Sequence, residues 1–171
     1  LVLKEKGGTW VDITVEGPGG HASRPWLARN AVDILYEVIT ELRQHFKTAE
    51  KEAWVDTLSI GAIQGGNLDI KDGVIVNGAG NVIAKKASAR IDIRLTEKTS
   101  HDRVYRIIED CLEKRRKQLG DGYKLSMNII TKVEHLNTDE NDAMVKQFYA
   151  IYEKSFGKPE LGKEHGASDG R

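Results

Sequence analysis

Hydrophobic and polar residues alternate along three stretches of the chain, and each alternation predicts a half-buried β-strand. The stretches cover Thr9 to Glu16, Trp54 to Gln64 and Val82 to Thr96. A fourth strand is expected from Tyr123 to Val133, where apolar residues again recur at every second position. The side chains expected on the inner faces of the second and fourth strands are Leu58, Ile60, Ala62, Leu125, Met127 and Ile129.

Two other stretches repeat apolar residues at helical spacing. The first runs from about Ala28 to Phe46, and its apolar side is Ala31, Leu35, Val38, Leu42 and Phe46. The second runs from about His101 to Leu119, with Ser100 as its expected N-cap and glycine after its last residue. Glycine, asparagine and aspartate are frequent from Gln64 to Asn81, which predicts a long loop.

The predicted order is β-α-β-β-α-β, which is typical of an α+β, ferredoxin-like fold. In that fold two helices cover one face of a four-stranded antiparallel sheet, and residues 1–135 are enough to complete it. Residues 136–171 are expected to form a further helix and a strand-like tail that cannot bury the helix's apolar stripe alone. We therefore interpret them as a fragment of a second domain, and the chain as a piece of a larger protein. That apolar stripe is Met144, Phe148, Ile151, Tyr152 and Phe156.

Composition narrows the range of partners. The 171 residues have a formal net charge of zero, which offers no general electrostatic argument for binding nucleic acid or an anionic membrane. No segment approaches the roughly 20 consecutive apolar residues that a membrane span needs. Cys111 is the only cysteine, so no intrachain disulfide can form, which fits a cytoplasmic location. Cys111 lies on the apolar side of the second helix and is expected in the core.

The candidate chemistry centres on a glycine-rich turn between the first strand and the first helix. This turn holds His21, whose neutral imidazole could donate a hydrogen bond to developing negative charge. A purely structural turn and a phosphate cradle are the alternatives, although no Lys-Ser/Thr follows as in a P-loop. Asn81 is either a turn residue or an oxyanion donor. Arg94 is solvated, paired with Asp92 or with a neighbouring strand, or available to a substrate carboxylate.

The remaining ionisable residues give weaker signals. Three histidines, at positions 45, 101 and 135, are expected to be structural or solvated, whereas the role of His165 stays open. The acidic residues near Glu134 and Glu140 are better explained by a helix start than by a metal site. The chain contains no nucleophile with its base and no recognisable metal-binding motif, so we assign no metal ligand.

Three segments resemble the M20 metallopeptidase family, which includes acetylornithine deacetylase, succinyl-diaminopimelate desuccinylase and aminoacylase. "GPGGHASRPWLARNAV" resembles the signature of that family's lid domain. "GNVIAKKASARIDIRLTE" resembles its Asn-Val-Ile-Pro strand, with Ala84 in place of the proline. "GASDGR" resembles the segment where the chain returns to the catalytic domain, with Ala167 where threonine is frequent. The three segments follow one another in the family's order.

The resemblance implies a lid that forms a homodimer and is inserted into a catalytic domain with two zinc ions. By resemblance, His21 would stabilise the oxyanion in the partner subunit's site, Asn81 would assist it, and Arg94 would bind a substrate carboxylate. A substrate-binding loop would contain Ser168, Asp169, Gly170 and Arg171. The dimer would form through the first helix and the second strand. The metal ligands and the general base would lie outside these residues, so the fragment alone is expected to be inactive.

The predicted function is thus part of a zinc-dependent amidohydrolase that removes acyl groups from N-acyl amino acids or cleaves small peptides. Two alternatives come from other classes of protein. One is a stand-alone ferredoxin-like module that binds a small ligand at the Gly17-to-His21 turn. The other is a structural dimerisation module without chemistry of its own.

Overall fold

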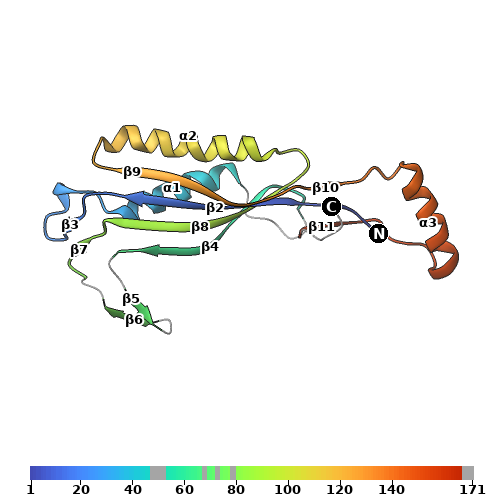
Figure 1. The fold of residues 1–171 in the computed structure, drawn as a ribbon, viewed down its shortest axis with the longest axis horizontal. Coiled ribbons are helices and arrows are strands. Elements are labelled where there is room, and N and C mark those ends of the chain that lie inside the picture. Colours follow the sequence, from blue (N-terminus) through green and yellow to red (C-terminus); the bar gives the residue numbers. More distant parts are fainter. Residues whose placement is uncertain (47–52, 67–68, 72–73, 78–79, 167–171) are drawn as a thin grey trace.

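The computed structural model describes residues 1–46, 53–66, 69–71, 74–77 and 80–166. Its main sheet contains β2 (Gly7–Glu16), β4 (Thr57–Gly65), β8 (Lys86–Leu95) and β9 (Lys124–Val133). The strands lie in the order β4-β8-β2-β9, and every neighbouring pair is antiparallel. Helices α1 (Ala31–His45) and α2 (His101–Leu119) cover one face of this sheet (Figure 1). The predicted ferredoxin-like α+β fold is confirmed.

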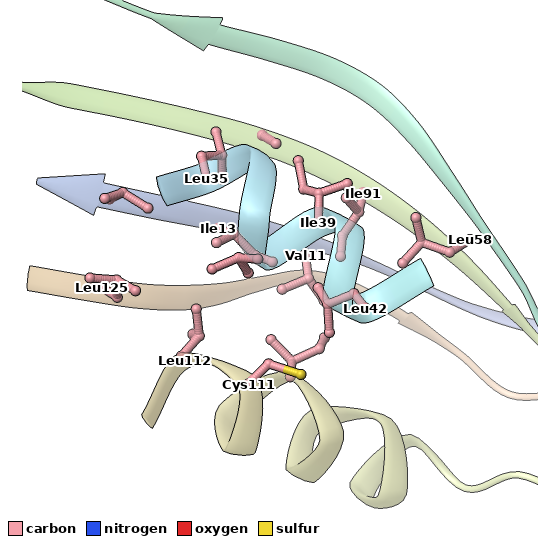
Figure 2. Packing of buried hydrophobic residues seen from close by; sticks show 14 of the residues in the cluster. Val11, Ile13, Leu35, Ile39, Leu42, Leu58, Ile91, Cys111, Leu112 and Leu125 are labelled. Atoms are coloured by element: carbon pink, nitrogen blue, oxygen red, sulfur yellow. The ribbon is translucent and has the colours of Figure 1, made fainter. Parts of the chain in front are cut away.

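The core lies between this sheet face and the two helices, as Figure 2 shows. Odd-numbered residues of β2 and β8, such as Ile13 and Ile91, point into it and are completely buried. Burying one such side chain contributes about 1.5–3 kcal/mol, so the alternating pattern fixes which face of each strand meets the helices. All five residues predicted for the apolar side of α1 are buried, which are Ala31, Leu35, Val38, Leu42 and Phe46.

Side-chain caps set the starts of both helices. The Oδ1 of Asn30 accepts a hydrogen bond from the backbone N–H of Val32 at 2.9 Å, so α1 begins at Ala31. The preceding residues form a short 3-10 helix, Pro25–Leu27, and the predicted start at Ala28 was therefore too early. Ser100 accepts from the N–H of Arg103 at 3.3 Å, which confirms the cap predicted for α2.

The second and third predicted strands differ in detail from the structure. The register of β4 shifts between Ile60 and Ala62, so Ala62 lies opposite Arg90 and is exposed instead of facing the core. The segment predicted as a long loop contains a small hairpin of β5 (Asp69–Lys71) and β6 (Val74–Asn77). The third strand is interrupted after a short β7 (Val82–Ile83), before β8 begins.

A second, three-stranded sheet joins the two ends of the chain. Its central strand is β1 (Val2–Glu5), which pairs antiparallel with β10 (Leu136–Asn137) and parallel with β11 (Gly162–Glu164). Helix α3 (Ala143–Phe156) lies beyond this sheet, at the opposite end of the molecule from the short strands β3 (Gly20–His21) and β7 (Figure 1). The apolar stripe of α3 is exposed, with Met144 and Phe156 more than three-quarters accessible. The division into residues 1–135 and 136–171 stays a prediction.

Within the described residues, no helix is long and apolar enough to cross a membrane.

Candidate functional site

The predicted site begins at the turn that carries His21. Strand β3 (Gly20–His21) pairs with β7, and the N–H of Ala22 donates to the backbone carbonyl of Asn81 at 2.7 Å. Gly19 has a φ of +65°, and a Cβ there would lie 2.3 Å from the Lys85 side chain, so the turn requires glycine. This short ladder holds His21 and Asn81 together although 60 residues separate them.

Ser23 determines which nitrogen of the His21 ring carries the proton. The backbone N–H of Ser23 donates to Nδ1 at 3.2 Å, and the Ser23 hydroxyl lies 2.8 Å from the same atom. A backbone N–H can only donate, so Nδ1 must be an acceptor. The proton of the neutral imidazole is therefore on Nε2.

The Nδ2 of Asn81 lies 3.2 Å from this Nε2. An N–H on Nε2 needs an acceptor, which a flip of the Asn81 amide supplies as Oδ1, so the two side chains are hydrogen-bond partners. Both side chains are exposed. Each side chain carries N–H groups, so a substrate oxygen that approaches the exposed pair could accept from both.

Arg94 lies at the other end of the main sheet. Arg94 is eight positions along β8 from Lys86, a distance of roughly 27 Å in an extended strand. Arg94 therefore lies far from the β3–β7 turn. Its Nε and Nη2 pair with the two carboxylate oxygens of Asp92, each at 2.8 Å. The pairing with Asp92 was one of the predicted alternatives. Within one chain, the fold brings His21 and Asn81 together but not Arg94.

The other predicted positions contribute less to this site. Ser168, Asp169, Gly170 and Arg171 lie outside the described residues. His165 packs edge-on against Trp54, with ring centroids 5.5 Å apart. The described residues contain no group of three or more His, Cys, Asp or Glu side chains that could hold a metal ion.

Cys111 is buried in the core, as predicted. Burial, followed by the negative charge of Glu41, raises the pKa of its thiol to about 11, which makes it a poor nucleophile near neutral pH.

A second polar cluster, which the sequence did not predict, surrounds Trp54 where the two sheets meet. The Trp54 indole donates to Glu97 at 2.8 Å, and Lys4 also donates to that carboxylate, at 3.1 Å. These hydrogen bonds lower the pKa of Glu97 to about 2. Lys6 donates to the carbonyl of Val55 at 2.7 Å, and burial lowers the pKa of its ammonium. Because these residues are distant in sequence, no local pattern could have shown the cluster.

Comparison with known families adds an independent observation. Residues 3–119 match the peptidase dimerisation domain of the M20 family. A succinyl-diaminopimelate desuccinylase from Rickettsia bellii is 25% identical to the chain, covering 100% of it and 41% of the desuccinylase. A probable carboxypeptidase from Ajellomyces dermatitidis is 26% identical over 77% of the chain and 28% of its own length. The chain thus spans well under half of the length of these relatives.

Solved structures show the same fold. The aminopeptidase PepT from Bacillus cereus superposes with a TM-score of 0.74 at 17% identity, covering 98% of this chain and 40% of the aminopeptidase. A tripeptidase from Staphylococcus aureus gives a TM-score of 0.73 at 19% identity, covering 99% of this chain and 40% of the tripeptidase. In both, the matching part is a minority of a longer chain.

Proposed function

The chain belongs to the M20 peptidase family through its dimerisation domain, and from this premise we propose that it forms the lid of a longer, zinc-dependent amidohydrolase. The substrates would be N-acyl amino acids or small peptides, because the similar proteins include a desuccinylase, carboxypeptidases and peptidases. The observation that carries the proposal is that His21 and Asn81, two exposed side chains that can each donate an N–H, lie 3.2 Å apart. A cytoplasmic location is part of the same proposal, since the sequence has one cysteine.

The zinc ions belong to the rest of the proposed enzyme. The described residues offer no group of side chains that fits a zinc ion, so we route no step of the mechanism through them. In the full-length enzyme, two zinc ions would supply the hydroxide that attacks the amide carbonyl. The segment Ser168, Asp169, Gly170 and Arg171 would contribute to substrate binding beside them.

The part of this chain in the reaction would be stabilisation of the tetrahedral oxyanion. Ser23 holds the proton of His21 on Nε2, and the amide of Asn81 lies 3.2 Å from that nitrogen. Donors held close together stabilise negative charge as it develops on the substrate oxygen, and removing one such donor typically costs about 10²–10³ in kcat. Both side chains are exposed, and they would act in the site of the partner subunit.

The separation of Arg94 from His21 supports this arrangement. Arg94 lies near one end of β8, which is roughly 30 Å long, and His21 lies in the β3–β7 turn beyond the other end. A small substrate cannot span that distance, so both residues could not serve one site from one subunit. In a homodimer, Arg94 would bind the carboxylate in one site while His21 acts in the other. The homodimer would form through α1 and the edge strand β4.

Subunit complementation of the full-length protein tests the proposal. His21→Ala should lower kcat by about 10²–10³ without lowering the melting temperature, because the side chain is exposed. A second variant, defective in a zinc ligand outside these residues, should also be inactive. Mixed dimers should regain activity, since one hybrid site combines intact zinc ligands with the partner's His21. Absence of recovery would contradict action across the dimer, and absence of amide hydrolysis by wild type would contradict the proposed enzyme class.

A further inference from the structure

The face of the main sheet opposite the helices carries rows of charged side chains from β2 and β8. Two arginines of β8 each form an ion pair with an aspartate. Arg90 pairs with Asp12 across the strands, and Arg94 pairs with Asp92 on its own strand. Among the described residues, an additional donor is found for the second pair alone, because the indole Nε1 of Trp10 donates to the Oδ2 of Asp92 at 3.0 Å.

Asp92 therefore orients two side chains at once. Trp10 and Asp92 are direct partners in the antiparallel register, and Arg94 lies opposite Gly8 on the same face. A Cβ built on Gly8 would lie 3.4 Å from the Cδ and 3.5 Å from the Nη1 of Arg94, so the guanidinium rests over a residue without a side chain. Nη2 donates to the Oδ2 of Asp92 at 2.8 Å, and Nε lies 2.8 Å from Oδ1 in the ion pair. Among the described residues, Nη1 has no hydrogen-bond acceptor.

Trp10 lies beside this guanidinium as an exposed apolar surface. It is 42% accessible, which is high for a side chain of this size on the middle of a sheet. Its hydrogen bond to Asp92 already fixes the ring next to Arg94, so the side chain loses little conformational entropy when a ligand binds. An aromatic surface beside a cation with free N–H groups suits a ligand with a carboxylate next to an apolar group.

We infer that Trp10 determines substrate specificity. Together with Arg94 it forms a subsite for a substrate carboxylate that neighbours an apolar side chain. Asp92 is the positioning residue of this subsite, since it holds both the guanidinium and the indole. This inference rests on the proposed function, because it concerns the carboxylate end of the substrate. The ring lies on one side of the guanidinium and contacts the apolar group next to the bound carboxylate.

The pair Arg90–Asp12 is the matched control. It lies on the same face and the same two strands, with N–O distances of 2.7 and 2.8 Å, but without an indole donor. If the Trp10 cluster were only a cross-strand ion pair that stabilises the sheet, variants of either pair would affect stability alone. A binding role predicts that only the Trp10 cluster changes KM.

Steady-state kinetics of the full-length enzyme separate these cases. The substrates are an N-acyl-leucine, its carboxamide and the corresponding N-acyl-glycine, with the acyl group that wild type hydrolyses fastest. Trp10→Ala should raise KM for the acyl-leucine about tenfold with kcat within twofold, and should reduce the preference for leucine over glycine. Trp10→Phe, which keeps the ring but loses the N–H, should have an intermediate KM. Arg90→Lys should leave both constants unchanged.

The outcomes distinguish this inference from the proposed function. If His21→Ala lowers kcat but Trp10→Ala leaves KM and the leucine preference unchanged, the subsite is wrong and the enzyme class stands. If wild type prefers glycine or the carboxamide, the subsite is also wrong. If wild type hydrolyses no amide, the proposed function fails and the subsite fails with it.

Discussion

At the scale of single residues, Glu97 links protonation to stability. The Trp54 indole and the Lys4 ammonium both donate to its carboxylate, and its pKa falls from 4.5 to about 2. A carboxyl group whose pKa is lowered by folding stabilises the native state above its unfolded pKa. That contribution disappears as the pH falls from 4.5 toward 2, and it amounts to at most about 3 kcal/mol.

Glu97→Gln should therefore flatten the acid dependence of stability. Wild type should lose free energy of unfolding between pH 4.5 and 2.5, whereas the variant should be less stable at pH 7 and change less over that interval. Urea unfolding at several pH values measures both. Glu140→Gln is the control, because Glu140 is exposed. Equal acid sensitivity in wild type and Glu97→Gln would contradict the assignment.

The sequence predicted part of the site because its signals are local. The glycines before His21 indicate a tight turn, and a histidine in such a turn stands out. The contact between His21 and Asn81 was not predictable, because Asn81 reaches His21 only through the β3–β7 pairing. Ser23 was missed for a different reason: the serine that sets the ring proton is two residues away, but only the folded turn directs its N–H to Nδ1.

At the scale of elements, Asn30 has a structural role within the segment "GPGGHASRPWLARNAV". Its side chain caps α1 through the N–H of Val32. Asn30→Ala should cost about 1 kcal/mol of stability, and Asn30→Asp or Asn30→Ser should recover most of it. Thermal or urea unfolding gives the values. A loss of activity from Asn30→Ala that exceeds its loss of stability would point instead to a direct catalytic part.

Strand and helix identity followed from periodicity because most elements here are long and bury one face. The bounds of α2 were predicted correctly, since Ser100 and Gly120 end the pattern on both sides. The shift in β4 was not predictable, because one residue inserted near Gly61 reverses the faces beyond it without changing the apolar composition. The small β10-β1-β11 sheet was missed because its strands are two to four residues long.

At the scale of the whole molecule, the two edges of the main sheet allow a test of the proposed dimer. Ile63 is 55% exposed on edge strand β4, and Ile130 is 39% exposed on the opposite edge strand β9. If β4 forms the interface, Ile63→Glu should weaken the dimer at least tenfold, because it places a charge in a buried contact. Sedimentation of full-length protein measures this, and Ile130→Glu should have little effect. The reverse pattern would place the interface on β9.

The exposed stripe of α3 gives another prediction for the whole molecule. Met144 and Phe156 are 77% and 78% accessible in the described structure. Met144→Gln with Phe156→Gln should change the stability of the 171-residue chain by less than about 0.5 kcal/mol per site and reduce its binding of a hydrophobic dye. In the full-length protein the same pair should cost several kcal/mol, on the order of 3, if a second domain covers the stripe. No cost there would contradict the second-domain interpretation.

The register between β2 and β9 has a consequence for protein engineering. Gly8, near the start of β2, lies opposite Val133, the last residue of β9. Residues on paired strands are about 5 Å apart, so the segment from Gly7 to Val133 begins and ends at nearly the same point in space. A unit with adjacent ends can be inserted into a surface loop of an unrelated host without separating the loop's anchors. The segment from Gly7 to Val133 is therefore suited to insertion into a surface loop of another protein.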